Sequence, residues 1–232
     1  MLYSCNRIRK ETVLVHKKMK ERHGHVMGKF SLEEVNNMYM DVLKEIGNIG
    51  AGNATTAIAK MVGARIDMNV PSVKLLEVSE LGRAVGEEDD TIIGIFLEVQ
   101  NDIQGSMMFL LDIESGHYLV NTLMCRDMSY NQDFDEMDLS ALKEVGNIIA
   151  ASYLTALSTL TKMSIAPSVP YIAVDMAAAI LSVPAIQFGM MGDKALLIQT
   201  EINADVAING YFILMPEPES YDKILASLGI QI

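Results

Sequence analysis

Apolar residues recur every three or four positions along two segments of this chain, the spacing that places them on one face of an α-helix. The first segment covers residues 31–62 and the second covers residues 134–160. Ser31 stands just before two glutamates, as is typical of a helix N-terminus, and Asp133 or Asp135 can begin the second segment. The pattern predicts two long amphipathic helices.

Short runs rich in isoleucine, valine, leucine and phenylalanine follow each predicted helix and are typical of β-strands. A polar triplet separates the last two runs of each set, which predicts antiparallel hairpins that turn at residues 100–102 and 203–205. Shorter helices over residues 114–125 and 217–228 follow the hairpins. The expected strands are residues 65–70, 72–76, 91–99 and 103–111, then 164–174, 195–202 and 206–215.

The same order of elements in both halves predicts an internal duplication rather than a solenoid, because there are only two copies and each is long. We expect an α/β fold: a single domain with pseudo-twofold symmetry, a mainly antiparallel central sheet, and the two long helices on one face. The halves would cover about residues 31–128 and 134–232. Two independent domains are the alternative, but each half is short for a core of its own.

A polar pattern is duplicated together with the apolar one. Glu45-Ile-Gly-Asn-Ile49 returns as Glu144-Val-Gly-Asn-Ile148, an offset of 99 residues (144 minus 45). Its polar members stand at i, i+4 and i+7, so they line one helix face that points away from the core. The repeated residues are Asp41, Glu45, Asn48 and Pro71 in the first copy, and Ser140, Glu144, Asn147 and Pro170 in the second.

Glycine and asparagine are poor choices for the middle of a helix, where glycine costs roughly 1 kcal/mol relative to alanine. Their presence in both copies, although many other positions have drifted, favours a function over a tolerated solvated face. We interpret Gly47 and Gly146 as allowing another surface to approach the helix, with the asparagine amide reaching into that surface.

The sequence contains no Ser-His-Asp set, no Walker loop and no zinc-ligand spacing. A carboxylate and an amide one turn apart make a poor catalytic site alone, but they could complete a site in another protein. An amide both donates and accepts hydrogen bonds, so it can orient a water molecule, and this is a usual protein contribution to phosphoryl transfer. The glutamate could pair with a lysine of the partner.

The pattern Asp/Ser-x3-Glu-x2-Asn-x22-Pro resembles the signature of the CheC–CheX–FliY phosphatases of bacterial chemotaxis, and both copies satisfy every spacing. The resemblance covers about residues 31–230 and is greatest to the CheC branch, because a CheX-like chain would carry one site and FliY an additional C-terminal domain. It implies a hydrolase that removes the phosphoryl group from the response regulator CheY. Residues 31–232 would then form one CheC-like phosphatase domain.

The resemblance also implies roles for the repeated residues. Asn48 and Asn147 would orient the attacking water in the active site of CheY-phosphate, and Glu45 and Glu144 would contact its lysine. The phospho-aspartate and Mg²⁺ would belong to CheY, so we expect no cofactor in this chain. The other repeated residues would be supporting: Asp41 and Ser140 for the helix face, Pro71 and Pro170 for the path of the chain after the helix.

The segments between each motif proline and the following hairpin differ between the halves. Residues 77–90 are highly charged and predict a solvated helix or loop, whereas residues 174–191 are almost entirely apolar. Burial against the sheet explains the apolar segment most simply, and an exposed helix that docks a partner is the alternative. The resemblance favours docking, since the family binds the receptor deamidase CheD. The candidate contacts are Asp175, Ala178, Ile180 and Leu181.

Composition limits the partners and the compartment. A formal net charge of −12 argues against nucleic acid and anionic membranes, and two cysteines are too few for a disulfide framework, which favours the cytoplasm. No apolar run is convincing as a membrane span. Residues 1–30 carry eight lysines and arginines but only two acids, and we expect them to form a poorly ordered basic extension rather than a signal sequence.

Two other functions are compatible with the same residues. One is a non-catalytic adaptor that sequesters CheY-phosphate or CheD, and the other is a structural component of the flagellar switch, as in the related FliM middle domain. The intact glutamates and asparagines argue against the structural component. The rate of phosphate loss from CheY separates the phosphatase from the adaptor.

Overall fold

A seven-stranded sheet, in which all paired strands are antiparallel, lies at the centre of the protein. The computed structural model describes residues 37–63, 67–85, 87, 89–188, 194–203 and 207–227. The strand order is β1-β6-β7-β3-β2-β4, and β5 also pairs with β2. The strands are β1 (Asp67–Glu77), β2 (Thr91–Asn101), β3 (Gly105–Asp112), β4 (Ile165–Pro167), β5 (Tyr171–Met176), β6 (Lys194–Asn203) and β7 (Ala207–Pro216).

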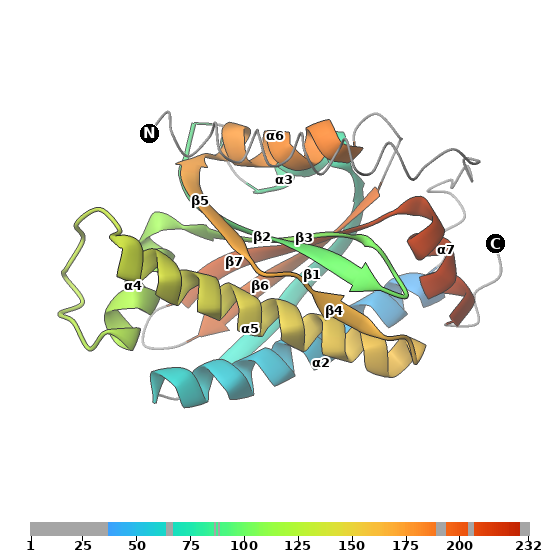
Figure 1. Cartoon of the computed structure of the whole chain (residues 1–232), viewed down its shortest axis with the longest axis horizontal. Coiled ribbons are helices and arrows are strands. Elements are labelled where there is room, and N and C mark those ends of the chain that lie inside the picture. The colour runs from blue at the N-terminus through green and yellow to red at the C-terminus, as the bar shows by residue number, and fades with distance from the viewer. Residues whose placement is uncertain are drawn as a thin grey trace.

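Helices cover both faces of this sheet, as Figure 1 shows. The long helices α2 (Asn37–Val62) and α5 (Glu136–Thr161) pack against each other on one face and run in opposite directions. The shorter α4 (Ile113–Leu123) and α7 (Pro218–Ser227) bury residues in the same layer. The opposite face carries α6 (Ala177–Phe188), α3 (Leu81–Val85) and the 3₁₀ helix η2 (Val78–Glu80). The predicted fold class is therefore confirmed.

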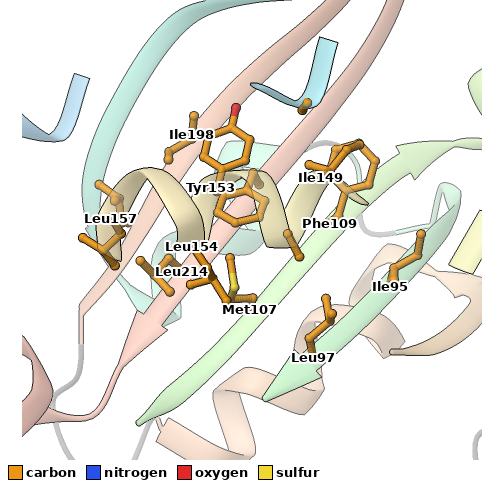
Figure 2. Close-up of a cluster of buried hydrophobic side chains, with 14 of the residues drawn as sticks. Ile95, Leu97, Met107, Phe109, Ile149, Tyr153, Leu154, Leu157, Ile198 and Leu214 are labelled. Atoms are coloured by element: carbon orange, nitrogen blue, oxygen red, sulfur yellow. The ribbon is translucent and has the colours of Figure 1, made fainter. Parts of the chain in front are cut away.

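Side chains of the central strands alternate between two hydrophobic layers, as the period of a β-strand requires. In β3, Met107 and Phe109 point toward α2 and α5, whereas Met108 and Leu110 point toward α6. Both sets are buried, so the strand is apolar on both faces. Figure 2 shows the larger layer, where Ile149, Tyr153, Leu154 and Leu157 of α5 lie among side chains of β2, β3, β6 and β7.

Each half of the chain contributes its first strand to the hairpin of the other half. β1 pairs with β6, β5 pairs with β2, and the two hairpins meet where β3 pairs with β7. The registers also correspond: Ser72 pairs with Gln199, and Tyr171 pairs with Phe96. A shift of 99 residues converts Ser72 into Tyr171, and a shift of 103 converts Phe96 into Gln199. The pseudo-twofold symmetry therefore extends to the hydrogen-bond ladder.

Several local expectations differ from the structure. The two strands expected on either side of Pro71 form one strand, β1, with a register shift between Asn69 and Ser72, and the strand expected over 164–174 is divided into β4 and β5. The charged segment is not simply solvated, because Val78 and Leu81 are buried. Ser31, the basic extension over residues 1–30 and the second hairpin turn lie mainly or wholly outside the described residues.

Candidate functional site

The repeated polar residues lie on the outer faces of α2 and α5, opposite the sheet. Glu45, Asn48 and Glu144 are exposed, and Asn147 is half-buried. Ser140 is exposed as well. The backbone of Asp41 belongs to α2, but its side chain lies outside the described part. Each long helix therefore presents a carboxylate and an amide to its surroundings, as the helical spacing predicted.

The motif glycines point the opposite way, toward the sheet. A Cβ added at Gly146 would lie 2.7 Å from both Cδ1 and Cγ2 of Ile95, and one added at Gly47 would lie 3.3 Å from Cγ1 of Val70. Both glycines are buried. Our interpretation that they allow an outside surface to approach is therefore wrong: the surface that approaches them belongs to the sheet of this protein.

The Gly-Asn pair therefore combines two requirements in neighbouring positions. Successive residues of an α-helix are rotated by about 100°, so a glycine that faces the sheet places the following asparagine toward the outside. Gly47 lets α2 pack closely on β1, and Gly146 lets α5 pack closely on β2. The result is an amide held on a helix whose distance from the core is fixed by close packing.

The motif prolines lie where the chain returns beneath each helix. Val70, which packs against Gly47, immediately precedes Pro71, and Pro71 lies within β1 at its register shift. Pro170 is half-buried between β4 and β5, immediately before Tyr171. Pro71 therefore lies within a strand and Pro170 between two strands, and their role in shaping the path of the chain stays a prediction.

Tyr153 sets the position of α5 against α2 at the point where the two helices touch. A Cβ added at Gly50 would lie 2.5 Å from Cδ1 of Tyr153 and 3.0 Å from its Cα. The tyrosine ring stacks on Phe212 with a centroid distance of 4.3 Å, and its hydroxyl is 3.3 Å from Oγ1 of Thr200. Burial raises the pKa of Tyr153 to about 12, and the hydrogen bond to Thr200 opposes this in part.

The point where α2 and α5 cross lies between the motif residues of α2 and those of α5. By the pseudo-twofold symmetry, the counterpart of the Gly50–Tyr153 contact is the pair Ala54 and Ile149. The centre of the crossing is then about four residues beyond each motif asparagine. An α-helix rises 1.5 Å per residue, so each asparagine lies about 6 Å from the crossing. Because the helices are antiparallel, the two asparagines lie on opposite sides of it, about 12 Å apart along the helix direction. This is too far for both to act on one phosphoryl group, so each helix carries its own site.

A cap and an ion pair hold the start of α5. Oδ1 of Asp135 accepts hydrogen bonds from the backbone N–H groups of Met137 and Asp138 at 2.8 and 2.9 Å. Oδ2 of Asp138 accepts one from the backbone N–H of Asp135 at 3.2 Å, which completes a capping box. Nη1 of Arg126 lies 2.7 Å from Oδ1 of the buried Asp138 and forms an ion pair with it, without the angle of a good hydrogen bond.

The sequence alone did not identify Arg126, Asp138 and Tyr153.

The residues expected to contact a partner lie on β5 and α6 and are divided between core and surface. Ile180 and Leu181 pack against the sheet and are only 3% and 7% exposed, so they are core residues and not exposed docking residues. This outcome corrects their assignment and agrees with the burial explanation. Ala178 is exposed, and Asp175 is half-buried with Oδ1 accepting a hydrogen bond from the backbone N–H of Met176.

Two further properties bear on the kind of site. Within the described ranges, no three histidine, cysteine, aspartate or glutamate residues are grouped so that they could hold a metal ion. Across the same ranges, no helix combines the length and the apolar character needed to cross a membrane. The exposed carboxylates and amides of α2 and α5 remain the groups best placed for chemistry, and they lie on the outer surface of a helical layer.

Comparisons with known proteins agree with this description. A model of the CheC-like family matches residues 38–75 and 137–173, which include both copies of the motif from helix to proline. CheY-P phosphatase CheC from Bacillus subtilis (strain 168) is 36% identical over 203 residues, which cover 83% of this chain and 95% of that protein.

Solved structures share the fold. FliY from Thermotoga maritima superposes with a TM-score of 0.68 and 20% identity, and the match covers 87% of this chain and 98% of that one. The FliM middle domain from Helicobacter pylori superposes with a TM-score of 0.63 and 12% identity, covering 83% and 99%. At these identities the likeness concerns the fold and does not extend to the chemistry.

Proposed function

This chain belongs to the CheC-like family, and from that premise and the geometry of α2 and α5 we propose that it is a phosphatase that accelerates the loss of the phosphoryl group from phosphorylated CheY. One observation carries the proposal. Each long helix holds an exposed glutamate and an outward-facing asparagine one turn apart, next to a glycine packed on the sheet. Such a helix face can enter the active site of another protein.

The asparagines perform the catalytic part of the reaction. Their amides hold a water molecule through one donated and one accepted hydrogen bond, in line with the bond between phosphorus and the aspartyl oxygen of CheY. The water oxygen attacks phosphorus, the bond to the aspartyl oxygen breaks, and the products are inorganic phosphate and the free carboxylate. Mg²⁺ held by CheY neutralises charge on the phosphoryl group. Asn48 and Asn147 act in this way at separate sites.

The glutamates align the partner. Glu45 and Glu144 lie one turn before the asparagines on the same exposed face, where each can pair with a lysine in the CheY site. Such an ion pair fixes how far the helix enters and so places the amide relative to phosphorus. Asp41 and Ser140 extend the same row by one turn in the N-terminal direction, where they support the helix face.

The decisive test removes both amides. The N48A/N147A variant is expected to lose the acceleration of phosphate loss from CheY by on the order of 100-fold or more, because no side chain then orients the water. Each single variant should keep the activity of the remaining site. Time-resolved phosphate release from phosphorylated CheY measures the effect. Asn53→Ala, an exposed asparagine of α2 outside the repeated set, is the matched control and should leave the rate unchanged.

Phosphate release from CheY at the wild-type rate in the double variant would overturn the proposal. The adaptor alternative predicts a different pattern, with binding of CheY-phosphate but an unchanged phosphate lifetime for the wild type. Regulation by CheD is a separate proposal that rests on the family resemblance. It predicts that adding CheD changes the rate of phosphate release catalysed by the wild-type protein.

A further inference from the structure

The duplicated helices keep identical residues for two different reasons, which burial distinguishes. Alignment of α2 and α5 at the offset of 99 gives several identical positions. Some are buried and are explained by packing; these are the counterparts Leu43 and Leu142, Gly47 and Gly146, and Ala51 and Ala150. Core packing does not explain identity at positions on the outer face. Besides the glutamate and asparagine, the identical residues of α5 with accessible side chains include Met137, Lys143 and Thr155.

Met137 is 63% exposed and belongs to the same row as the motif. It precedes Ser140 by three residues and Glu144 by seven, so all three side chains lie on one face of α5. Its counterpart in α2 is Met38, also a methionine. A single exposed apolar residue needs no explanation by itself, but the sequence has methionine at this position in both copies, and on α5 it extends the polar row with a flexible apolar contact.

Lys143 stands four residues before Asn147, and Lys44 stands four residues before Asn48. Residues at this spacing are neighbours on a helix surface. Lys44 is exposed and Lys143 is half-buried, and Lys143 forms no ion pair with a described residue. Each amide therefore has a cation beside it in a protein with a net charge of −12, at a place where the ligand carries a phosphorylated carboxylate.

We propose that the receiver domain of phosphorylated CheY docks on a surface larger than the motif. At the α5 site, Met137 is an apolar anchor one turn before the motif, and Lys143 is a cation beside the amide. At the α2 site, Lys44 is the corresponding cation. This inference rests on the proposed function.

The test uses a protein with one working site. In the N48A background only the α5 site remains, and M137A is added to it. The added substitution is expected to raise the KM for CheY-phosphate about tenfold with little change in kcat, and to weaken binding of beryllofluoride-activated CheY by a similar factor. Met128→Ala is the matched control, because Met128 is 55% exposed but lies between α4 and α5, outside both motif helices. It should change neither quantity.

Far-ultraviolet circular dichroism verifies that every variant is folded.

The outcomes separate this inference from the proposed function. If N48A/N147A still dephosphorylates CheY, the proposed function fails. If that variant is inactive, but M137A in the N48A background leaves both the KM and the binding of activated CheY within twofold of the control, the extended docking surface is wrong and the phosphatase stands.

Discussion

α2 and α5 present nearly the same outer surface on different internal packing. On the outside, both carry the glutamate, the asparagine and the neighbouring lysine. On the inside, the counterparts at the crossing differ in size. Gly50 of α2 corresponds to the larger Ile149 of α5, and Ala54 of α2 corresponds to the larger Tyr153 of α5. The core tolerated redistribution of volume between the copies, whereas the glutamate and the asparagine of the outer row did not change. The difference shows that the outer row is constrained by something other than folding.

The packing beneath the motif glycines differs in tightness as well. Gly146 lies against the branched side chain of Ile95, with 2.7 Å available for a Cβ, whereas Gly47 has 3.3 Å before Val70. The two glycines are identical in sequence, but the neighbouring side chains leave less space for a Cβ at Gly146 than at Gly47. This comparison can be tested at three places, in order of decreasing effect on stability: at Gly50 in the crossing, at the buried hydroxyl of Tyr153, and at the motif glycines.

The largest effect is expected at the crossing. Gly50→Ala would place a Cβ against the ring and backbone of Tyr153 and should lower the free energy of unfolding by about 3 kcal/mol, measured by chemical denaturation. Gly52→Ala is the matched control: nothing lies within 4 Å of its Cβ position, so the better helix propensity of alanine should stabilise the protein by about 1 kcal/mol. Equal effects of the two substitutions would contradict the asymmetric crossing.

The buried hydroxyl of Tyr153 should make stability depend on pH in the alkaline range. Its folded pKa of about 12 lies above the value of about 10 in an unfolded chain. Its contribution is therefore complete below pH 10 and is lost as the pH rises to 12, by up to about 3 kcal/mol. Denaturation at a series of pH values measures this loss. Tyr153→Phe should remove this decrease, and a variant with the wild-type pH profile would contradict the assignment.

The smallest effect is expected under the motif glycines. Gly146→Ala should destabilise the protein by about 1–2 kcal/mol, because the clash with Ile95 exceeds the gain in helix propensity. Gly47→Ala should be close to neutral, since Val70 needs to move by only a few tenths of an ångström. Thermal unfolding of the two variants measures the difference. A reversed order would show that the α2 motif is packed more tightly than the α5 motif.

The sequence predicted that Glu45, Asn48 and Glu144 are exposed, because the face of a helix on which a residue lies depends on local periodicity. The spacing of Asp41, Glu45 and Asn48 defines a helix face without any knowledge of the sheet. The direction of Gly146 could not be read in the same way: sequence shows that the residue is small, but its neighbour, Ile95, belongs to a strand 51 residues earlier (146 minus 95). The function of the glycine was therefore assigned to the wrong side of the helix.

Long-range pairing explains the other differences. The exchange of β1 and β5 between the halves depends on strand partners more than 70 residues away, as in the pair Tyr171 and Phe96, and no turn signal encodes it. Similarly, the apolar character of Ile180 and Leu181 was compatible with both the core and an exposed surface, and their packing on the sheet decided between them. The identity between copies, by contrast, was visible in the sequence from the start.

The strand exchange has a consequence for the synthesis of the protein. The hairpin of β2 and β3 is complete once residue 112 has been made, but its outer edges pair with β4, β5 and β7, and the partner of β1 is β6. At about 5–20 residues per second, the ribosome needs about 5–20 s more to reach residue 216. During that time the strands of the first half have unpaired edges, which are templates for aggregation. A nascent chain of this fold therefore depends on the second half being synthesised promptly, or on a chaperone that covers these edges.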